Sequence, residues 1–168
     1  YLVISKLPAH DIGSFMKGKI RSFGVSDDFF MYDQSPAARV GIYYYENGAY
    51  PRKPKVIYDR NHSSFFSLDI DEIPEEVYTA SKCFHTTGIT LALNEDIRET
   101  TIEMIKRFKA AGTLVSFDVN FRGNLWTGDQ ARECILRILP YVDIFFCSED
   151  TARLTFLKTG TADRKSVV

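Results

Sequence analysis

The sequence predicts an α/β fold, in which a mostly parallel sheet is flanked by helices and a small antiparallel β-hairpin lies outside that sheet. The first observation is that strand-like and helix-like segments alternate from Ser67 onward, a pattern that builds a parallel sheet with helices packed on its faces. The second is that two strand-like segments before Ser67, Arg39 to Glu46 and Lys55 to Arg60, carry many tyrosines and charges. They are too polar for strands buried on both faces.

Composition bounds the class of protein. A chain of 168 residues is one ordinary domain or a piece of a larger one, and with 45% hydrophobic and 26% charged residues it can build a core. Its formal charge of -1 gives no overall attraction to nucleic acid or to an anionic membrane. No apolar run approaches the roughly 18 residues that span a bilayer. Cys83, Cys134 and Cys147 lack metal-ligand and redox spacing, so we expect reduced core cysteines in a cytoplasmic protein.

The first segment, Tyr1 to Ser5, looks like a strand already under way and has no initiator methionine, so we expect the amino-terminal part of the natural protein to be missing. An amphipathic helix follows, with an acidic cap at Asp11 and a glycine stop at Gly24. Its apolar residues recur at steps of three and four, at Ile12, Phe15, Met16, Ile20 and Phe23. A short extended piece over Phe29 to Tyr32 comes next.

Two aromatic-rich segments, Arg39 to Glu46 and Lys55 to Arg60, form the expected hairpin. Their alternating pattern predicts strands, and the connection between them contains Asn47-Gly48 and Pro54, which predict a turn. The pattern alone favours an ordinary edge hairpin with one solvent-exposed face, since such alternation is the usual antiparallel pattern.

The remaining elements are predicted from caps, breakers and apolar periodicity. The expected strands are Lys82 to His85, Thr113 to Val119 and Val142 to Cys147. The expected helices are Asp71 to Ala80 with Pro74 in its first turn, the segment from the Asn94 cap to Gly112, the segment from the Thr127 and Gln130 capping box to Leu139, and a last helix from Ser148 toward Leu157. The tail after Gly160 is polar and predicts no element.

The strand from Thr113 to Val119 ends in a polar hook at Asn120 and Arg122, which marks a candidate site. Open parallel sheets bind ligands outside the carboxyl ends of their strands. Asn supplies a donor and an acceptor, and Arg a planar charged fork that suits carboxylate or phosphate. Equally, the Asn could start a turn and the Arg could be solvated. Ser148, at the next strand end, caps a helix or faces the same crevice, and the two roles are compatible.

Two other features of the sequence give only weak evidence of a functional site. His85 ends its strand as a lone histidine, which is more often a hydrogen-bonded structural residue than a catalytic one. The glycines are scattered, so neither the dinucleotide-binding fingerprint nor the Walker phosphate loop is present.

An ordered set of short segments resembles those of sugar kinases of the ribokinase-like (PfkB) family. Each segment alone is weak, but their order is specific for the family, and the likeness covers about residues 1–160 and is greatest for 2-keto-3-deoxygluconate kinases. The segments are Ile4 to Pro8 with Asp11 to Gly13, Arg21 to Gly24, Arg39 to Tyr43, Val56 to Arg60, His85 with Gly88 to Thr90, Asp118 to Arg122 with Leu125 and Trp126, and Tyr141 to Ile144.

The resemblance implies a doubly wound, ribokinase-like α/β domain of which residues 1–168 are a part, with both terminal parts missing and the hairpin over residues 39–60 as a lid. It implies ATP-dependent phosphorylation of a sugar or sugar acid, with 2-keto-3-deoxygluconate and its 6-phosphate as the expected pair. ATP, Mg²⁺ and the small-molecule sugar acid are the implied partners. Lid hairpins in this family often pair two subunits, which would make a homo-oligomer.

Site residues follow from the same resemblance. The expected substrate-binding residues are Tyr43, Tyr45, Arg39, Arg60 and Arg122, and the expected nucleotide-binding residues are Asn120, Arg122 and Ser148. Phosphoryl transfer by such a site consists mainly of positioning and charge stabilisation.

The chain departs from the family pattern in three ways. Tyr45 stands where some members have a lid arginine, so carboxylate recognition would fall to Arg39 or Arg60. Ser148 to Thr151 replaces the usual Asn-x-x-Glu, which leaves no glutamate at its last position. The G-A-G-D anion hole with its catalytic aspartate lies outside these 168 residues, as does the glycine-rich sugar site. A fructokinase-like or ribokinase-like specificity, or a non-catalytic sugar-binding relative, therefore remains an alternative.

Overall fold

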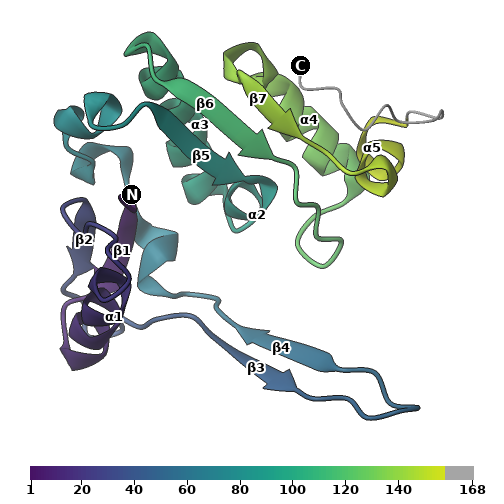
Figure 1. Ribbon diagram of the computed structural model, residues 1–168, viewed down its shortest axis with the longest axis horizontal. Coiled ribbons are helices and arrows are strands. Elements are labelled where there is room, and N and C mark those ends of the chain that lie inside the picture. Colours follow the sequence, from purple (N-terminus) through teal and green to yellow (C-terminus); the bar gives the residue numbers. More distant parts are fainter. Residues whose placement is uncertain (158–168) are drawn as a thin grey trace. The chain divides into compact units, whose positions relative to one another are not determined.

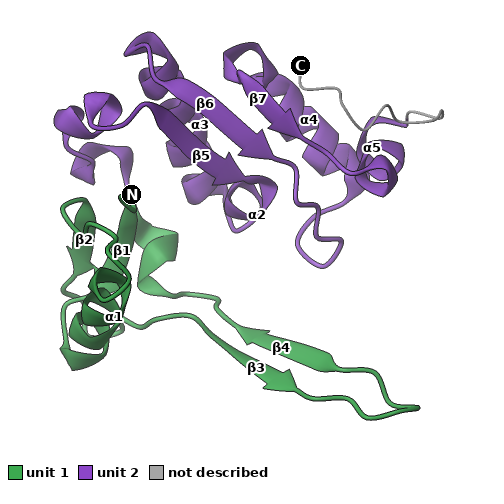
Figure 2. Cartoon of the chain, in the orientation of Figure 1, with its two compact units in different colours: residues 1–68 green, residues 69–168 purple. Residues whose placement is uncertain are grey.

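The computed structural model describes residues 1–157 (Figure 1). Contacts divide the chain into two compact units, residues 1–68 and residues 69–168, coloured separately in Figure 2. The polar tail after Gly160 lies outside the described residues. Within the described part, no helix is long and apolar enough to cross a membrane.

A two-stranded parallel sheet forms the base of the first unit. Strand β1 (Ser5–Pro8) pairs with β2 (Phe30–Asp33), and their inward side chains Leu7 and Phe30 are buried. The expected strand at the start of the chain was misplaced, because regular pairing begins only at Ser5. Before it, Leu2 forms a single bridge to Ser26.

Helix α1 (Asp11–Arg21) has a histidine cap, and the acidic cap expected at Asp11 was wrong. The side chain of His10 accepts a hydrogen bond from the backbone N–H of Ile12, whereas Asp11 lies in the first turn. Gly13 is required where the helix meets β1, because a Cβ there would lie 1.8 Å from the Pro8 carbonyl oxygen.

The hairpin consists of β3 (Ile42–Glu46) and β4 (Lys55–Asp59), which pair antiparallel in a sheet of their own, as expected. Every residue of both strands is exposed. Pairing begins at Ile42 and not at Arg39, since both backbone polar groups of Arg39 bond to Ser64, the first residue of the 3₁₀ turn η1 (Ser64–Ser67).

The second unit opens with two 3₁₀ turns, η2 (Ile70–Glu72) and η3 (Glu75–Thr79), and the single helix expected over Asp71 to Ala80 was wrong. Pro74 is the physical reason. Proline lacks a backbone N–H and disfavours the helical region for the residue before it, and Ile73 is accordingly extended.

A three-stranded parallel sheet follows, in the order β5 (Cys83–Thr87), β6 (Leu114–Asp118), β7 (Ile144–Phe146), as the alternating pattern predicted. The connecting helices are α2 (Gly88–Leu91), α3 (Glu95–Ala110), α4 (Gly128–Ile138) and α5 (Glu149–Phe156), with the 3₁₀ turn η4 (Leu139–Tyr141) after α4. The caps at Asn94, Thr127 with Gln130, and Ser148 were all predicted correctly, and only the short α2 was missed.

The core of this unit lies between the sheet and helices α3 and α4, which lie behind it in Figure 1. Val115, Phe117 and Val119 are fully buried on β6 and just beyond it, and Phe84 of β5 stacks on Phe108 of α3 with ring centroids 4.1 Å apart. The apolar side chains at every second position all lie in the core, as the hydrophobic period of the strand predicted, and the packing also buries Ser116 between them, at 6% exposure.

The three cysteines are unpaired, but only Cys134 is a buried core residue. Cys147 is half-buried, and Cys83 is exposed because it lies on the face of β5 opposite Phe84, on the outer strand of the described sheet. The expectation of core cysteines is therefore confirmed for Cys134, was wrong for Cys83, and holds only in part for Cys147.

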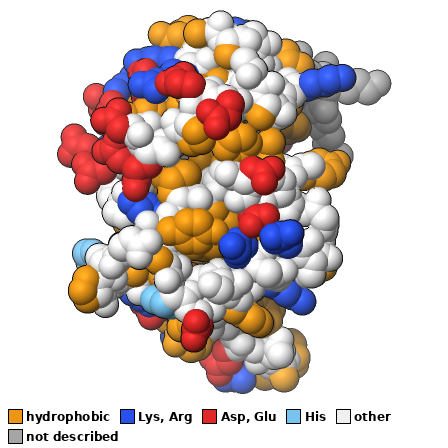
Figure 3. Space-filling view, turned by 90° about the vertical axis from the view of Figure 1, so that its left-hand side faces the viewer, with side chains coloured by type: hydrophobic (Ala, Val, Ile, Leu, Met, Phe, Trp, Pro, Cys, Tyr) orange, Lys and Arg blue, Asp and Glu red, His pale blue; other side chains and the backbone are white. Residues whose placement is uncertain are grey.

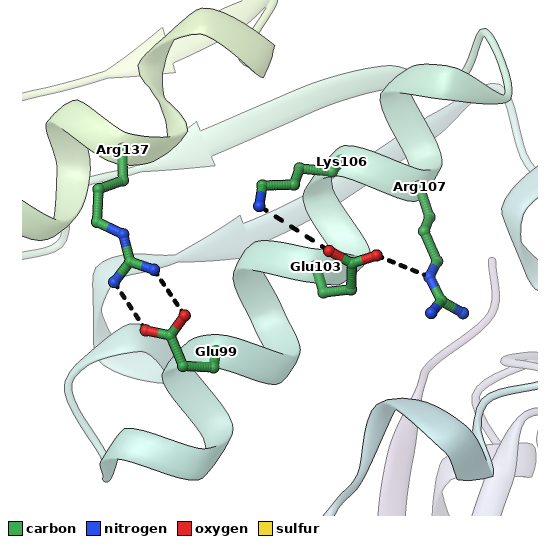
Figure 4. A network of polar contacts seen from close by, with 5 residues as sticks. All are labelled: Glu99, Glu103, Lys106, Arg107 and Arg137. Atoms are coloured by element: carbon green, nitrogen blue, oxygen red, sulfur yellow. Dashed lines mark hydrogen bonds and ion pairs between the residues drawn. The ribbon is translucent and has the colours of Figure 1, made fainter.

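Ion pairs tie α3 to the elements beside it (Figure 4). Arg137 of α4 donates two hydrogen bonds to Glu99, at 2.7 and 2.6 Å, and Arg107 contacts both Glu103 and Glu75 at 3.1 Å. The two-point contact of Arg137 places its positive charge beside Glu99 and lowers the pKa of that carboxyl. A fork-on-carboxylate pair of this kind fixes geometry as well as charge.

Candidate functional site

The carboxyl ends of the three parallel strands form one edge of the second unit. Thr87, Asp118 and Phe146 are register partners on neighbouring strands and end β5, β6 and β7 respectively. Asn120 and Ser148 therefore follow adjacent strand ends, as the sequence required for a shared site. Parallel sheets present ligand-binding side chains at such an edge.

The turn after β6 is held by Asp118. Its Oδ1 accepts a hydrogen bond from the backbone N–H of Asn120 at 3.0 Å, and Asn120 takes a positive φ of 37°. Asn tolerates this left-handed region better than most residues. The turn interpretation of Asn120 is thus correct, and the half-buried residue has its backbone held at the strand end.

Arg122 lies just beyond this turn and is exposed. Its Nη1 donates a hydrogen bond to the carbonyl oxygen of Phe121 at 3.1 Å, and within residues 1–157 no carboxylate forms an ion pair with it. A solvated guanidinium with unused donors is available for an anionic ligand.

Gly88 allows the closest approach at this edge, and reasoning from the sequence missed its role. A Cβ at Gly88 would lie 2.2 Å from the carbonyl oxygen of Val119 and 3.3 Å from Cζ2 of Trp126. The segment after β5 thus packs directly on the end of β6. Asp118 was also missed as a structural determinant. An aspartate two residues before an Asn at a strand end was the available signal, because Asp often accepts from the backbone two residues on.

Ser148 caps α5. Its Oγ accepts from the backbone N–H of Thr151 at 3.2 Å and lies 2.9 Å from the Thr151 hydroxyl oxygen. The carboxylate of Glu149 pairs with Arg153, one turn along the helix. Next to Ser148, burial raises the pKa of the Cys147 thiol, and the negative charge of Asp118 adds to that rise. The cap interpretation of Ser148 is therefore correct, and its exposed position leaves a ligand contact open.

His85 is a hydrogen-bonded residue of the sheet. Its Nδ1 lies 2.9 Å from Oγ of Ser116, its register partner on β6. The His85 side chain thus forms a hydrogen bond between β5 and β6, as the structural interpretation of the sequence expected.

The lid residues form a second group, in the first unit. Tyr43 and Tyr58 are register partners on β3 and β4, and the centroids of their rings are 6.4 Å apart. The guanidinium carbon of Arg60 lies 4.7 Å from the centre of the Tyr58 ring. Because side chains alternate across a strand, Tyr43, Tyr45, Tyr58 and Arg60 belong to one face of the hairpin. This face combines exposed aromatic rings with one cation.

Arg39, the other candidate cation, is occupied within the hairpin. Its Nη2 lies 2.7 Å from the Asp59 carboxylate and its Nη1 donates to the carbonyl oxygen of Asn61 at 2.9 Å. Within the described hairpin, no carboxylate forms an ion pair with Arg60. Of the two arginines proposed from the sequence for an acidic ligand, only Arg60 has its charge unpaired.

A surface hollow of about 410 Å³ lies elsewhere in the second unit, between η2 and α3. None of the side chains predicted from the sequence lines it. Four of its eight lining residues are acidic, and two of these, Glu99 and Glu103, are in ion pairs. The lining residues are Asp69, Ile70, Asp96, Glu99, Thr100, Ile102, Glu103 and Lys106. Acidic side chains also gather on the upper left of the face drawn in Figure 3.

Comparison with known proteins identifies the family. The chain is 35% identical over 159 residues to 2-dehydro-3-deoxygalactonokinase of Haloferax volcanii, covering 95% of this chain and 49% of the relative. It is 30% identical to probable fructokinase-3 of Arabidopsis thaliana, over 98% of this chain and 47% of that protein. The crystal structure of 2-dehydro-3-deoxygluconokinase of Thermotoga maritima superposes with a TM-score of 0.87 at 30% identity, over 94% of this chain and 48% of that one.

The chain thus spans about half the length of the curated relatives it matches. The family description "pfkB family carbohydrate kinase" matches residues 2–168, and the chain belongs to that family.

Proposed function

We propose that the full-length protein transfers a phosphoryl group from ATP to a sugar acid, with 2-keto-3-deoxygluconate as the substrate and its 6-phosphate as the product. Membership of a carbohydrate kinase family supports the reaction class. Because these residues span half of the relatives, the catalytic aspartate and the rest of the sugar site would come from the other half.

One observation carries the choice of an acidic sugar. On the aromatic face of the lid, the Arg60 cation lies over the Tyr58 ring without a carboxylate partner among the described lid residues. A guanidinium in this setting binds a carboxylate through two parallel hydrogen bonds. Aromatic rings beside it, such as Tyr43, suit the apolar face of a sugar ring or chain. A neutral hexose would leave the cation unused.

Nucleotide binding is assigned to the strand ends of the second unit. Asn120 and Ser148 would face the nucleotide, and Arg122 would face the phosphate groups and the substrate. Within residues 1–157 no three His, Cys, Asp or Glu side chains gather as metal ligands. Mg²⁺, which the family resemblance implies, would be bound largely through phosphate oxygens and water, as is usual for this ion.

The proposal also covers the residues that contact the sugar and the cellular location of the protein. Tyr43 and Tyr45 would contact the sugar acid on the lid, and the unpaired cysteines are in keeping with the cytoplasm. Pairing of two lids would make the protein a homo-oligomer. The opposite face of the hairpin, with exposed Ile42, Tyr44 and Ile57, is apolar enough to support such contact.

Steady-state kinetics of the full-length protein test the substrate. With ATP and Mg²⁺, 2-keto-3-deoxygluconate should give a kcat/KM at least about 10-fold above fructose, since the loss of one charged contact costs 1.5 kcal/mol or more. The 2-keto-3-deoxygalactonate epimer is the second candidate, because the Haloferax relative carries that name. A preference for fructose would reject the acid assignment.

The alternative is a non-catalytic sugar-binding protein. Thr151 favours this alternative, because its side chain supplies no carboxylate and both its hydroxyl and its backbone N–H bond the Ser148 hydroxyl. Binding of the sugar acid by calorimetry without any turnover of ATP would establish it.

A further inference from the structure

The root of the lid, residues 39–41 and 59–64, is organised by a single side chain. The Arg39 guanidinium bonds the Asp59 carboxylate at 2.7 Å, the Asp59 carbonyl oxygen at 3.3 Å and the Asn61 carbonyl oxygen at 2.9 Å. Asp59 and Asn61 are the residues on either side of Arg60. The planar Arg39 guanidinium therefore bonds the backbone directly before and directly after Arg60, the cation that we assign to the substrate carboxylate.

The backbone of Arg39 is itself anchored. Its N–H donates to the Ser64 hydroxyl at 3.2 Å and its carbonyl accepts from the Ser64 N–H at 2.8 Å. Ser64 is only 2% exposed, so this attachment belongs to the packed body of the first unit. The side chain that bonds the two residues flanking Arg60 therefore extends from a backbone that is itself held in place.

The segment that Arg39 grips would otherwise be poorly determined. His62 has a positive φ of 57°, which is uncommon outside glycine, and the Ser63 N–H closes a turn onto the Arg60 carbonyl oxygen at 3.2 Å. A two-stranded hairpin with every strand residue exposed is also only marginally stable by itself. The direction of the Arg60 side chain needs an external restraint.

Stability alone does not account for Arg39. The side chains of Arg39 and Asp59 are 34% and 50% exposed, and ion pairs so exposed contribute only about 0 to 1 kcal/mol. Three acceptors held by one rigid fork instead give geometric definition. Such contacts also leave few donors of Arg39 for a ligand.

We propose that Arg39 is a positioning residue, which fixes Arg60 on the aromatic face of the lid and does not itself bind the substrate. This inference rests on the proposed function, because it assumes that Arg60 meets the carboxylate of a sugar acid.

The test compares Arg39→Met and Arg39→Lys in the full-length protein with Arg52→Met, which removes the other arginine–carboxylate pair of the hairpin, that between Arg52 and Glu46. Arg39→Met should raise the KM for 2-keto-3-deoxygluconate on the order of 3-fold to 10-fold, while kcat and the KM for ATP change little. Lysine should not rescue it, because one ammonium cannot reach three acceptors in a plane. Arg52→Met should behave as the unmodified protein.

A double-mutant cycle separates positioning from direct contact. If Arg39 acts through Arg60, Arg39→Met should add nothing to Arg60→Met in the KM for the acid. Fully additive effects would show that Arg39 contacts the substrate independently and would overturn the inference.

Amide hydrogen exchange without any sugar gives a readout that does not depend on the substrate. Residues 59–63 should exchange faster in Arg39→Met and at the normal rate in Arg52→Met. Unchanged exchange in Arg39→Met would overturn the positioning role. If exchange accelerates but Arg60→Met leaves the KM for the acid unchanged, the carboxylate assignment of the proposed function fails instead.

Discussion

The carboxylate of Asp118 holds the backbone N–H of Asn120 at 3.0 Å and so turns the chain out of β6 at a positive φ. A side chain two residues upstream thereby helps to set the backbone conformation of Asn120. This contact separates two properties of Asn120, its backbone conformation and its side-chain amide, which substitution can address one at a time.

Asn120→Gly should retain the turn and Asn120→Ala should strain it, because glycine reaches positive φ without steric cost. We expect alanine to lower the free energy of unfolding by about 1 kcal/mol more than glycine. Urea denaturation measures this difference. If the amide contacts phosphate, both variants should lose activity alike, and an active glycine variant would assign Asn120 a backbone role only.

Gly88→Ala should destabilise the protein by more than about 2 kcal/mol, since its Cβ would lie 2.2 Å from a backbone oxygen that has little freedom to move. Gly18→Ala is the matched control. Nothing lies within 4 Å of a Cβ there, and the position is inside α1, so alanine should stabilise by about 0.5 to 1 kcal/mol. Equal denaturation midpoints for the two variants would contradict the packing of Gly88 on Val119.

Arg122→Lys should lower kcat/KM of the full-length kinase about 10-fold to 100-fold, or roughly 1.4 to 2.7 kcal/mol, because lysine keeps the charge but lacks the two-point fork. The melting temperature should hardly change, since the guanidinium is exposed and bonds only a neighbouring carbonyl. Arg132→Lys, in a surface pair with Asp129, is the control. A sharp drop in melting temperature with intact kinetics would make Arg122 a structural residue.

Acid sensitivity should depend on Asp143. The Lys109 ammonium and then the backbone N–H of Val115, 2.9 Å away, lower the pKa of this carboxyl. A lowered pKa in the folded state contributes stability that is fully present above the unfolded value of about 3.9 and is lost as the pH falls through the folded value.

Asp143→Asn should therefore destabilise the protein at pH 7, and the difference from the unmodified chain should shrink as the pH falls below about 4. Denaturation at several pH values measures it. A difference that stays constant with pH would remove Asp143 as a source of acid sensitivity.

Tyr43→Ala should raise the KM for the sugar acid more than the KM for ATP, because Tyr43 lies on the same face of the lid as Arg60. Tyr50→Ala is its control, because Tyr50 lies in the connection between β3 and β4 and on neither face of the strands. Both rings are exposed, at 66% and 101%, so unequal stability cannot account for a difference. Equal KM values for the two variants would remove this face from the substrate site.

Local signals in the sequence determined most of the fold. Val115, Phe117 and Val119 lie at every second position, a period that indicates a strand, and all three are buried. Asn94, Thr127 and Ser148 satisfy backbone donors within three residues, so those helix starts required no tertiary information. Where a local signal was overruled, at the segment from Asp71 to Ala80, Pro74 removed the donor that a continuous helix needs.

Tertiary structure decided what the arginines and glycines do. Arg39 and Arg60 were equivalent candidates in the sequence, and only the fold brought the Asp59 carboxylate and the Asn61 carbonyl to Arg39 while leaving Arg60 over Tyr58. Gly88 likewise looked like one of many scattered glycines until β5 and β6 became neighbours. Caps and periods act within a few residues of the chain, whereas these roles arise from contacts between segments about 20 to 30 residues apart, which no local pattern encodes.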